Sequence, residues 1–304
     1  MSTKKDKFSI KDKLYMELAL DLAKVREGHT GSNPSVGCVI VKNDRIISIG
    51  QTSLDGRPHA EQNAIKNCQE NLLGAKIYVT LEPCCHYGKT SPCTSAIISS
   101  KISEVFYSIK DIDQRVNGRS KKILNSKKII VKTGLLKEKI SKFYYPYFYN
   151  RKYKLPYVTG KIAISKNNLI YSKGNKRITN SLSDNFTHLL RYKNDSIMVS
   201  YKTLNKDNSK LNCRLKKLKN FTPKRIILDK KLNLNTKSYL YKTVKKNNTF
   251  VFYNKASESK IKEFKKNKIK LIRLRLSKDK QFDFKIVLKK LYNLGMRNIL
   301  IEGG

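Results

Sequence analysis

His59, Glu61, Cys84 and Cys93 are the residues whose types and spacing point most directly to chemistry. One imidazole and two thiolates can hold a zinc ion and leave its fourth position open for water. Zinc brings the pKa of that water to about 7, which supplies hydroxide at neutral pH. Glu61, two residues after the histidine and not itself a ligand, would carry a proton from the water to a leaving amine. The pattern therefore predicts a catalytic zinc site that removes an amino group by hydrolysis.

Two alternatives to this site follow from the same residues. Cys85 is the natural rival of Cys84 as a ligand because the two are adjacent. A purely structural zinc normally has four protein ligands, whereas three are well placed here, so a non-catalytic, zinc-stabilised binding module is the less favoured interpretation. Six cysteines in 304 residues are too few for a disulfide scaffold, which favours metal binding.

The composition sets the class of protein. The chain has 304 residues, 39% of them hydrophobic, which is enough for two globular domains. Its formal charge of +42 comes from 65 Lys and Arg against 23 Asp and Glu. The cations are mostly lysines spread from end to end, so we interpret them as a solvated surface, with a nucleic-acid footprint as the alternative. No apolar stretch approaches the roughly 20 residues that cross a bilayer. The charged N-terminus lacks a secretory leader, so we expect a cytoplasmic protein without membrane contact.

The first half of the chain must position the zinc residues, and its patterning predicts an α/β layered domain. Apolar residues at helical spacing predict a helix over residues 14–26, and period-two alternation predicts a hairpin of strands 36–41 and 46–49. Pro58 is expected in the first turn of a helix that carries His59 and Glu61 and ends near residue 71. Further strands are expected at residues 77–81, 105–108 and 129–133, with a helix at 94–100.

The second half alternates strands with helices, which favours a mostly parallel sheet covered on both faces. Strands are predicted at residues 157–164, 196–199, 225–228, 249–253, 269–274 and 298–302, and helices at 181–191, 257–266 and 284–294. The stretch 143–156 lacks a clean period and is expected to be the junction between domains 1–148 and 149–304. Because the last strand leads directly into Gly303 and Gly304, we expect the sequence to stop inside a glycine loop that binds phosphate.

These motifs resemble the RibD family of bifunctional riboflavin biosynthesis proteins, in which a pyrimidine deaminase is fused to a reductase. The resemblance rests on residues 33–41, 59–61, 156–161, 223–229 and 302–304, and on the step of nine positions (93 − 84) between two cysteines. It implies a cytidine-deaminase-like α/β/α domain followed by a dihydrofolate-reductase-like α/β domain. It also implies deamination of a diaminopyrimidinone ribosylamine phosphate, then NADPH-dependent reduction of its ribose to a ribityl chain. The expected partner is this small phosphorylated pyrimidine and no specific nucleic acid; a homo-oligomer is left open.

The resemblance implies roles for individual residues. In the first domain, the zinc ligands would be His59, Cys84 and Cys93, the proton carrier Glu61, and the substrate contacts Asn33, His86 and Lys89. In the second domain, the implied substrate contacts are Asn175, Arg191, Leu211, Arg214 and Glu302. The implied NADPH contacts are Ala163, Arg177, Thr203, Asp207, Lys230, Gly303 and Gly304.

Four features depart from the family pattern. Thr52 stands where a histidine is common, and Arg177 stands in place of a tryptophan. Residues 166–168 are Lys-Asn-Asn in place of Leu-Asp-Gly, and residues 200–201 occupy a stretch that commonly has glycine. All but Thr52 lie in the second half. Two alternatives therefore stay open: a deaminase with a weakened reductase domain, and a zinc deaminase that acts on a nucleic-acid base.

Overall fold

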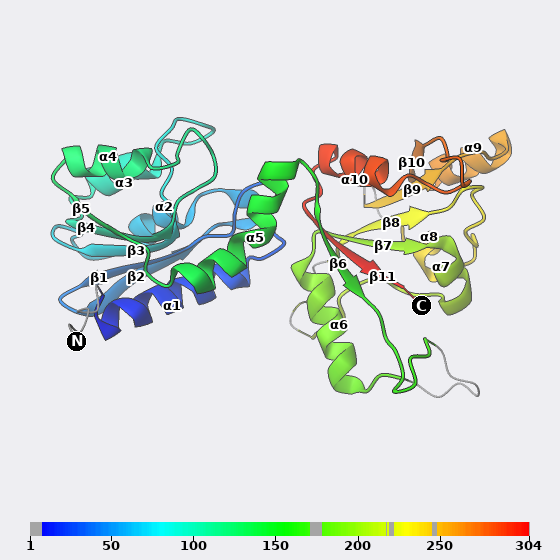
Figure 1. Cartoon of the computed structure of the whole chain (residues 1–304), viewed down its shortest axis with the longest axis horizontal. Helices are drawn as coiled ribbons and strands as arrows, with labels where there is room; N and C mark the ends of the chain where they lie inside the picture. The colour runs from blue at the N-terminus through cyan, green and yellow to red at the C-terminus, as the bar shows by residue number, and fades with distance from the viewer. Residues whose placement is uncertain (1–7, 171–177, 217, 219–221, 245–247, 304) are drawn as a thin grey trace. The chain divides into compact units, whose positions relative to one another are not determined.

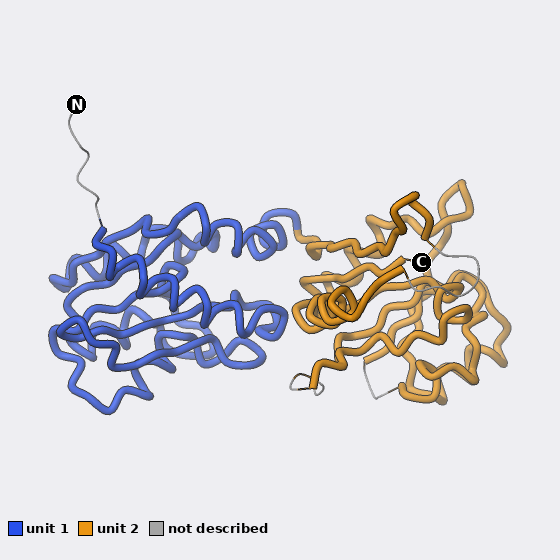
Figure 2. The backbone as a smooth tube through the Cα atoms, turned by 90° about the horizontal axis from the view of Figure 1, so that it is seen from below, with its two compact units in different colours: residues 1–153 blue, residues 154–304 orange. Residues whose placement is uncertain are grey.

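The computed structural model describes residues 8–170, 178–216, 218, 222–244 and 248–303. The chain divides into two compact units, Met1–Tyr153 and Lys154–Gly304 (Figure 2). Each unit contains one β-sheet flanked by helices (Figure 1). Asn175, Arg177 and Gly304, three of the expected site residues, lie outside the described residues. No helix in the described ranges is long and apolar enough to cross a membrane.

The sheet of the first unit has five strands in the order β2-β1-β3-β4-β5. They are β1 (Gly37–Lys42), β2 (Arg45–Gln51), β3 (Lys76–Leu81), β4 (Glu104–Ile109) and β5 (Ile130–Thr133). β1 and β2 form the predicted hairpin, whose turn residues Asn43 and Asp44 have positive φ angles that these residue types tolerate. β3, β4 and β5 are parallel. The loops that follow β3 and β4 therefore leave the same edge of the sheet.

Five helices cover this sheet. α1 (Ile10–Val25) and α5 (Lys137–Tyr153) lie on one face, and α2 (Ala60–Asn67), α3 (Cys93–Ser99) and α4 (Arg119–Ser126) lie on the other (Figure 1). Two glycines allow close approach. A Cβ atom at Gly37 would lie 1.8 Å from the carbonyl oxygen of Ala19 in α1, and one at Gly50 would lie 2.2 Å from that of Ala60 in α2. α2 therefore packs directly against β2.

The first unit differs from the sequence prediction most clearly at α2, α4 and α5, and α1 also begins four residues before its predicted start (14 − 10). α2 ends at Asn67 rather than near residue 71, and His59 is its N-cap rather than part of its first turn. α4 was not predicted. Residues 143–153, predicted to be irregular, belong to α5. Aromatic residues lie all round α5 and hide its period, so that only packing against the sheet selects Ile140 and Tyr144 as buried positions.

The sheet of the second unit has six parallel strands in the order β10-β9-β8-β7-β11-β6. The strands are β6 (Tyr157–Lys161), β7 (Ser196–Ser200), β8 (Lys224–Leu228), β9 (Thr249–Tyr253), β10 (Lys270–Arg273) and β11 (Asn298–Glu302). The helices are α6 (Ser181–Lys193), α7 (Tyr201–Asp207), α8 (Tyr239–Lys242), α9 (Glu258–Lys266) and α10 (Phe284–Asn293).

Alternate residues of these strands face two separate cores. Ile197 and Val199 of β7 belong to the core that includes residues of α7, α8 and α9, whereas Met198 belongs to the core that includes α10. The predicted parallel sheet with helices on both faces is confirmed. β6 ends at Lys161, three residues before its predicted end (164 − 161), and α7 and α8 were not predicted.

Candidate active site

The three candidate zinc ligands come together where α2 and α3 begin. His59 is the N-cap of α2, Cys84 follows β3, and Cys93 is the first residue of α3. The Nδ1 atom of His59 lies 3.5 Å from Cys84 Sγ and 3.4 Å from Cys93 Sγ, and the three ligand atoms all lie within 4.8 Å of one another. Ordinary zinc bond lengths in a tetrahedral arrangement separate nitrogen from sulfur by about 3.6 Å. The donor set and its spacing therefore fit a zinc ion.

The environments of the two adjacent cysteines differ. The thiol of Cys85 points to the carbonyl oxygen of Arg115, 3.3 Å away. Cys84 Sγ instead accepts a hydrogen bond of 3.3 Å from the backbone N–H of Cys93. The neighbouring Cys93 thiol and this hydrogen bond lower the pKa of the Cys84 thiol to about 4. A thiolate is the form that binds metal, so the geometry favours Cys84 over Cys85.

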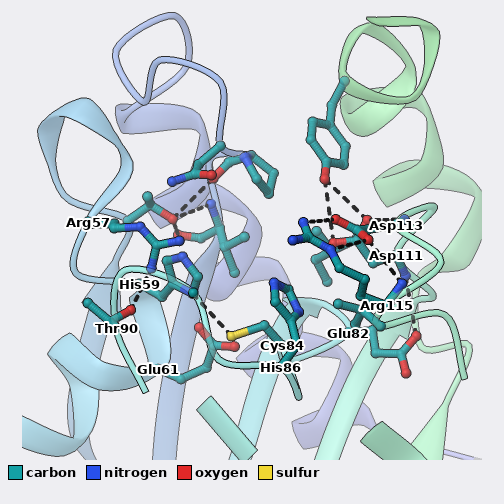
Figure 3. Close-up of a pocket in the computed structure, with 18 of the residues that line it drawn as sticks. Arg57, His59, Glu61, Glu82, Cys84, His86, Thr90, Asp111, Asp113 and Arg115 are labelled. Carbon is teal, nitrogen blue, oxygen red and sulfur yellow. Dashed lines mark hydrogen bonds and ion pairs between the residues drawn. The ribbon is translucent and has the colours of Figure 1, made fainter. Parts of the chain in front are cut away.

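Glu61 lies beside the candidate ligands in the first turn of α2, and 3% of the residue is exposed. Burial raises the pKa of its carboxyl group to about 7. A group with a pKa near neutrality can both accept and donate a proton at working pH. Figure 3 shows its carboxyl group next to Cys84 and His59.

A pocket of about 690 Å³, including its open mouth, lies over these residues. Asn33 and His86, two of the expected substrate contacts, line it, whereas Lys89 is exposed and outside the lining. Asn33 Nδ2 donates to the carbonyl oxygen of Gly56 at 3.0 Å. The Nδ1 atom of His86 is buried and has no hydrogen-bond partner within the described ranges. Thr52 also lines this pocket, and its hydroxyl accepts a hydrogen bond from the backbone N–H of Val36.

Several lining residues were not predicted from the sequence, namely Arg57, Asp111, Asp113, Arg115, Tyr147 and Arg151. A signal for three of them was present, because the loop after β4 must lie beside the loop after its parallel neighbour β3. Glu82 holds the β4 loop in place by accepting hydrogen bonds from the backbone N–H groups of Asp111, Gly118 and Ser120. No local pattern singles out Arg57 or Arg151.

In the second unit, expected substrate contacts come together at the end of β11. Arg191 of α6 binds Glu302 through Nε–Oε1 and Nη2–Oε2 contacts of 2.7 Å each. Arg191 also donates to the carbonyl oxygen of Asn212 at 3.3 Å, which places the buried Leu211 and the exposed Arg214 nearby in the chain. The structure therefore joins Arg191 to Glu302 and brings to the same arginine the segment around Asn212, in which Leu211 is part of the hydrophobic core.

A second pocket, of about 1120 Å³ including open solvent, lies at the carboxyl ends of β7 and β8. Lys230, an expected NADPH contact, lines it together with Lys202 and Lys231. Thr203 and Asp207 lie on α7, Ala163 follows β6, and Gly303 follows β11. Nucleotides bind at the carboxyl ends of parallel strands, and lysines suit their phosphates. The lysine-rich lining therefore suits the phosphates of NADPH, and Lys230 is the expected contact that lies in it, whereas Ala163, Thr203, Asp207 and Gly303 are not among its lining residues.

Two family models match the chain. The model of the cytidine and deoxycytidylate deaminase zinc-binding region matches residues 9–109, and that of the RibD C-terminal domain matches residues 156–304. Riboflavin biosynthesis protein RibD of Actinobacillus pleuropneumoniae is 35% identical over 292 residues, which cover 95% of this chain and 77% of the relative. Diaminohydroxyphosphoribosylamino-pyrimidine deaminase of Buchnera aphidicola is 42% identical over 147 residues, which cover 48% of this chain and 100% of the relative.

A solved structure resembles both units together. The diaminohydroxyphosphoribosylaminopyrimidine deaminase/5-amino-6-(5-phosphoribosylamino)uracil reductase of Thermotoga maritima is 31% identical, with a TM-score of 0.83, and the match covers 97% of this chain and 81% of that protein. The predicted family, the two-domain fold and the use of zinc and NADPH are confirmed. Because these matches extend over both units, the chain belongs to the RibD family of riboflavin biosynthesis enzymes, which combine a zinc-dependent deaminase with an NADPH-dependent reductase.

Proposed function

We propose that this chain hydrolyses the ring amine of 2,5-diamino-6-ribosylamino-pyrimidinone 5′-phosphate and then reduces the ribosyl group of the product to ribityl with NADPH. Residues 1–148 are assigned to the deaminase domain and residues 149–304 to the reductase domain. The observation that carries the proposal is the group of His59, Cys84 and Cys93 with the buried Glu61 beside it, at one pocket. The name of the Thermotoga protein describes the same two activities.

In the deaminase, His59, Cys84 and Cys93 hold the metal. A bound zinc ion supplies a water molecule with a pKa of about 7 as the nucleophile. The carboxylate of Glu61 would take a proton from this water as its oxygen bonds to the ring carbon. The amine would leave as ammonia with one of the water's protons, the other would go to the adjacent ring nitrogen, and a carbonyl group would remain. Asn33 and His86 orient the pyrimidine from the pocket wall. The exposed Lys89, on the loop between Cys84 and Cys93, is proposed as a third substrate contact at the pocket's mouth.

In the reductase, the substrate contacts are Arg191, Leu211, Arg214 and Glu302, and the cofactor contacts are Ala163, Thr203, Asp207, Lys230 and Gly303. The assignments of Asn175, Arg177 and Gly304 rest on the sequence resemblance, since these residues lie outside the described ranges. NADPH supplies the hydride, so the protein must place the sugar carbon and hold phosphate groups. The exposed guanidinium of Arg214 suits a phosphate because it can bind two oxygens at once.

Ammonia release from the proposed substrate tests the deaminase. We expect release by the zinc-loaded wild type and a rate at least about 100-fold lower in Glu61→Gln, because an amide cannot carry the proton. Both proteins should hold about one zinc ion per chain, the number that one three-ligand site takes. Equal rates in the two proteins would contradict the role of Glu61. Zinc binding without ammonia release by the wild type would contradict the proposed substrate.

Oxidation of NADPH in the presence of the deaminated product tests the reductase. A rate in the ordinary enzyme range, about 1–1000 per second, would establish a full reductase. Negligible oxidation by protein that still releases ammonia would favour the alternative of a weakened reductase domain. In that case Arg177→Trp should raise the rate, because tryptophan restores a flat stacking surface.

The proposed partner is a small phosphorylated pyrimidine. A deaminase acting on a nucleic-acid base would bind RNA with an affinity that falls steeply as the salt concentration rises. An enzyme that acts on a small molecule should bind RNA only weakly and nonspecifically. We propose a cytoplasmic location because the cysteines are free and zinc-binding thiolates need a reducing compartment. Sedimentation of the zinc-loaded protein decides whether it forms a homo-oligomer.

A further inference from the structure

Three arginines from three different segments line the pocket over the candidate zinc ligands. Arg57 lies between β2 and α2, Arg115 lies in the loop after β4, and Arg151 lies in the last turn of α5. Figure 3 shows Arg57 on one side and Arg115 on the other, with His86 between them in this view. The resemblance stated from the sequence assigned a role to none of the three.

Arg57 is held against the loop that connects Cys84 to Cys93. Its Nη1 atom donates to the hydroxyl of Thr90. Its Nη2 atom lies 3.4 Å from the position that a Cβ atom would take at Gly88, so the missing side chain there leaves room for the guanidinium. The Thr90 hydroxyl accepts from one of the five N–H donors of the Arg57 guanidinium, so other donors remain for a further acceptor.

Arg151 is held by the turn that contains Asn33. Its Nη2 atom donates to the carbonyl oxygen of Ser32 at 3.1 Å, and its guanidinium carbon lies 5.3 Å from the ring centre of Tyr147. Asn33 in turn donates to Gly56, the residue before Arg57. The Ser32–Asn33 turn therefore links the two arginines, and both belong to the wall that the proposed substrate contact Asn33 occupies.

The charges of these arginines are balanced differently. Asp113 binds Arg115 with two contacts, Oδ1 to Nε at 3.0 Å and Oδ2 to Nη2 at 2.6 Å. Within the part of the chain that the structure describes, neither Arg57 nor Arg151 forms an ion pair with a carboxylate.

The other pocket acids are already occupied. Glu82 accepts from backbone N–H groups, and Asp111 accepts from the hydroxyl of Tyr147 and the N–H of Asp113. Arg57 and Arg151 therefore line the pocket without a carboxylate in ion-pair contact among the described residues, although the charge of Arg151 still acts on Asp111. Guanidinium groups with free donors suit a phosphate monoester.

We propose that Arg57 and Arg151 bind the 5′-phosphate of the deaminase substrate. The assignment rests on the proposed deaminase function and deepens it. The ring amine must reach Glu61 and the zinc ligands, and the phosphate at the other end of the ribosylamine then needs cations that line the same pocket, as these two do. The guanidinium of Arg115 is already bound by the carboxylate of Asp113, and we assign Arg115 the role of positioning the loop after β4.

The test compares two substrates, the phosphorylated pyrimidine and the same compound after removal of its phosphate. In Arg57→Gln and Arg151→Gln, KM for ammonia release from the phosphorylated substrate should rise about 10-fold or more, because a hydrogen bond to a charged group contributes about 1.5–3 kcal/mol. KM for the dephosphorylated substrate should change less than about twofold, because that substrate has no phosphate for the arginines to bind. Substitutions that remove no important contact change free energies by about 0.5 kcal/mol or less.

Arg45→Gln is the matched control, because it removes the same charge at the exposed start of β2, where Arg45 pairs with Glu70. It should leave both substrates unaffected. Equal losses for the two substrates in Arg57→Gln and Arg151→Gln, or no loss for either, would overturn the assignment. Zinc content and the urea unfolding curve of each variant show whether an equal loss comes from misfolding. A wild type that releases no ammonia from either substrate would contradict the proposed function itself, which distinguishes the two failures.

Discussion

Arg191 and Glu302, 111 positions apart in the sequence, bind each other through two contacts of 2.7 Å. Their side chains are 11% and 12% exposed, so the ion pair is largely shielded from water. The pair joins the C-terminal half of α6 to the carboxyl end of β11. Both residues belong to the proposed substrate site of the reductase. The Glu302 carboxylate already accepts from the Nε and Nη2 atoms of the Arg191 guanidinium.

Removal of one partner from this ion pair should destabilise the second unit. Arg191→Met leaves the Glu302 carboxylate buried without a counter-charge, so we expect the free energy of unfolding to fall by about 3–5 kcal/mol. Urea unfolding of the zinc-loaded protein measures the change. The double variant Arg191→Met/Glu302→Leu should be less destabilised than Arg191→Met, because no charge is then left unpaired.

Arg214→Met is the control for this prediction. Arg214 is exposed and donates to the side chain of Asn212, so its removal should change the free energy of unfolding by less than about 0.5 kcal/mol. Equal destabilisation by Arg191→Met and Arg214→Met would show that the buried ion pair contributes no more to the free energy of unfolding than the exposed arginine does.

The two adjacent cysteines should respond differently to substitution by serine. Cys84→Ser removes a sulfur that lies 3.5 Å from the His59 nitrogen, whereas Cys85→Ser changes a side chain that faces the Arg115 carbonyl oxygen. We expect Cys84→Ser to lose zinc and ammonia release, and Cys85→Ser to keep both, because zinc affinity depends on thiolate ligands. Metal content after dialysis measures the difference. Loss of zinc from Cys85→Ser and its retention in Cys84→Ser would reverse the ligand assignment.

Gly50→Ala should disturb the zinc site through the backbone. The new Cβ atom would lie 2.2 Å from the carbonyl oxygen of Ala60, so α2 must move away from β2. Overpacking of this kind typically costs about 1–3 kcal/mol, and α2 begins at His59, so zinc should also bind less tightly. Unfolding and zinc titration measure both effects. Gly160→Ala is the control, because a Cβ atom there would meet nothing within 4 Å.

The Asp113–Arg115 pair should make a small contribution to stability that depends on pH. The Arg115 guanidinium holds the pKa of the Asp113 carboxyl group well below its usual value. A lowered pKa in the folded state means that the contribution is complete above the unfolded-state pKa of about 3.9 and is lost as the pH falls toward the folded-state pKa.

At neutral pH we therefore expect Asp113→Asn to be less stable than the wild type by about 0.5–1 kcal/mol, the range of exposed pairs, because 63% of the Arg115 side chain is exposed. The difference should shrink below about pH 3, where the unfolded carboxyl group is protonated. Urea unfolding of both proteins across this range measures it, and a difference that grows on acidification would contradict the sign.

The sequence by itself determined the chemistry of the metal site. It also determined the helices and strands whose apolar residues recur with a single clear spacing. Each candidate zinc ligand directly follows a proline, at positions 58, 83 and 92, and prolines mark the boundaries of elements. The β1–β2 hairpin was also readable, because its apolar alternation and its Asn43–Asp44 turn are local signals. α5 was not readable, since aromatic residues surround it and burial alone distinguishes Ile140 and Tyr144.

The tertiary structure decided which distant residues meet. Arg57 meets Thr90, Arg151 meets Ser32, and Arg191 meets Glu302, although nothing local in the sequence marks these pairs. The last pair forms because β11 is inserted between β7 and β6, and strand order is set by the packing of whole helices and strands. Residue types therefore determined what the sites can do, whereas sheet order and helix packing decided which cations reach the pocket and which are neutralised.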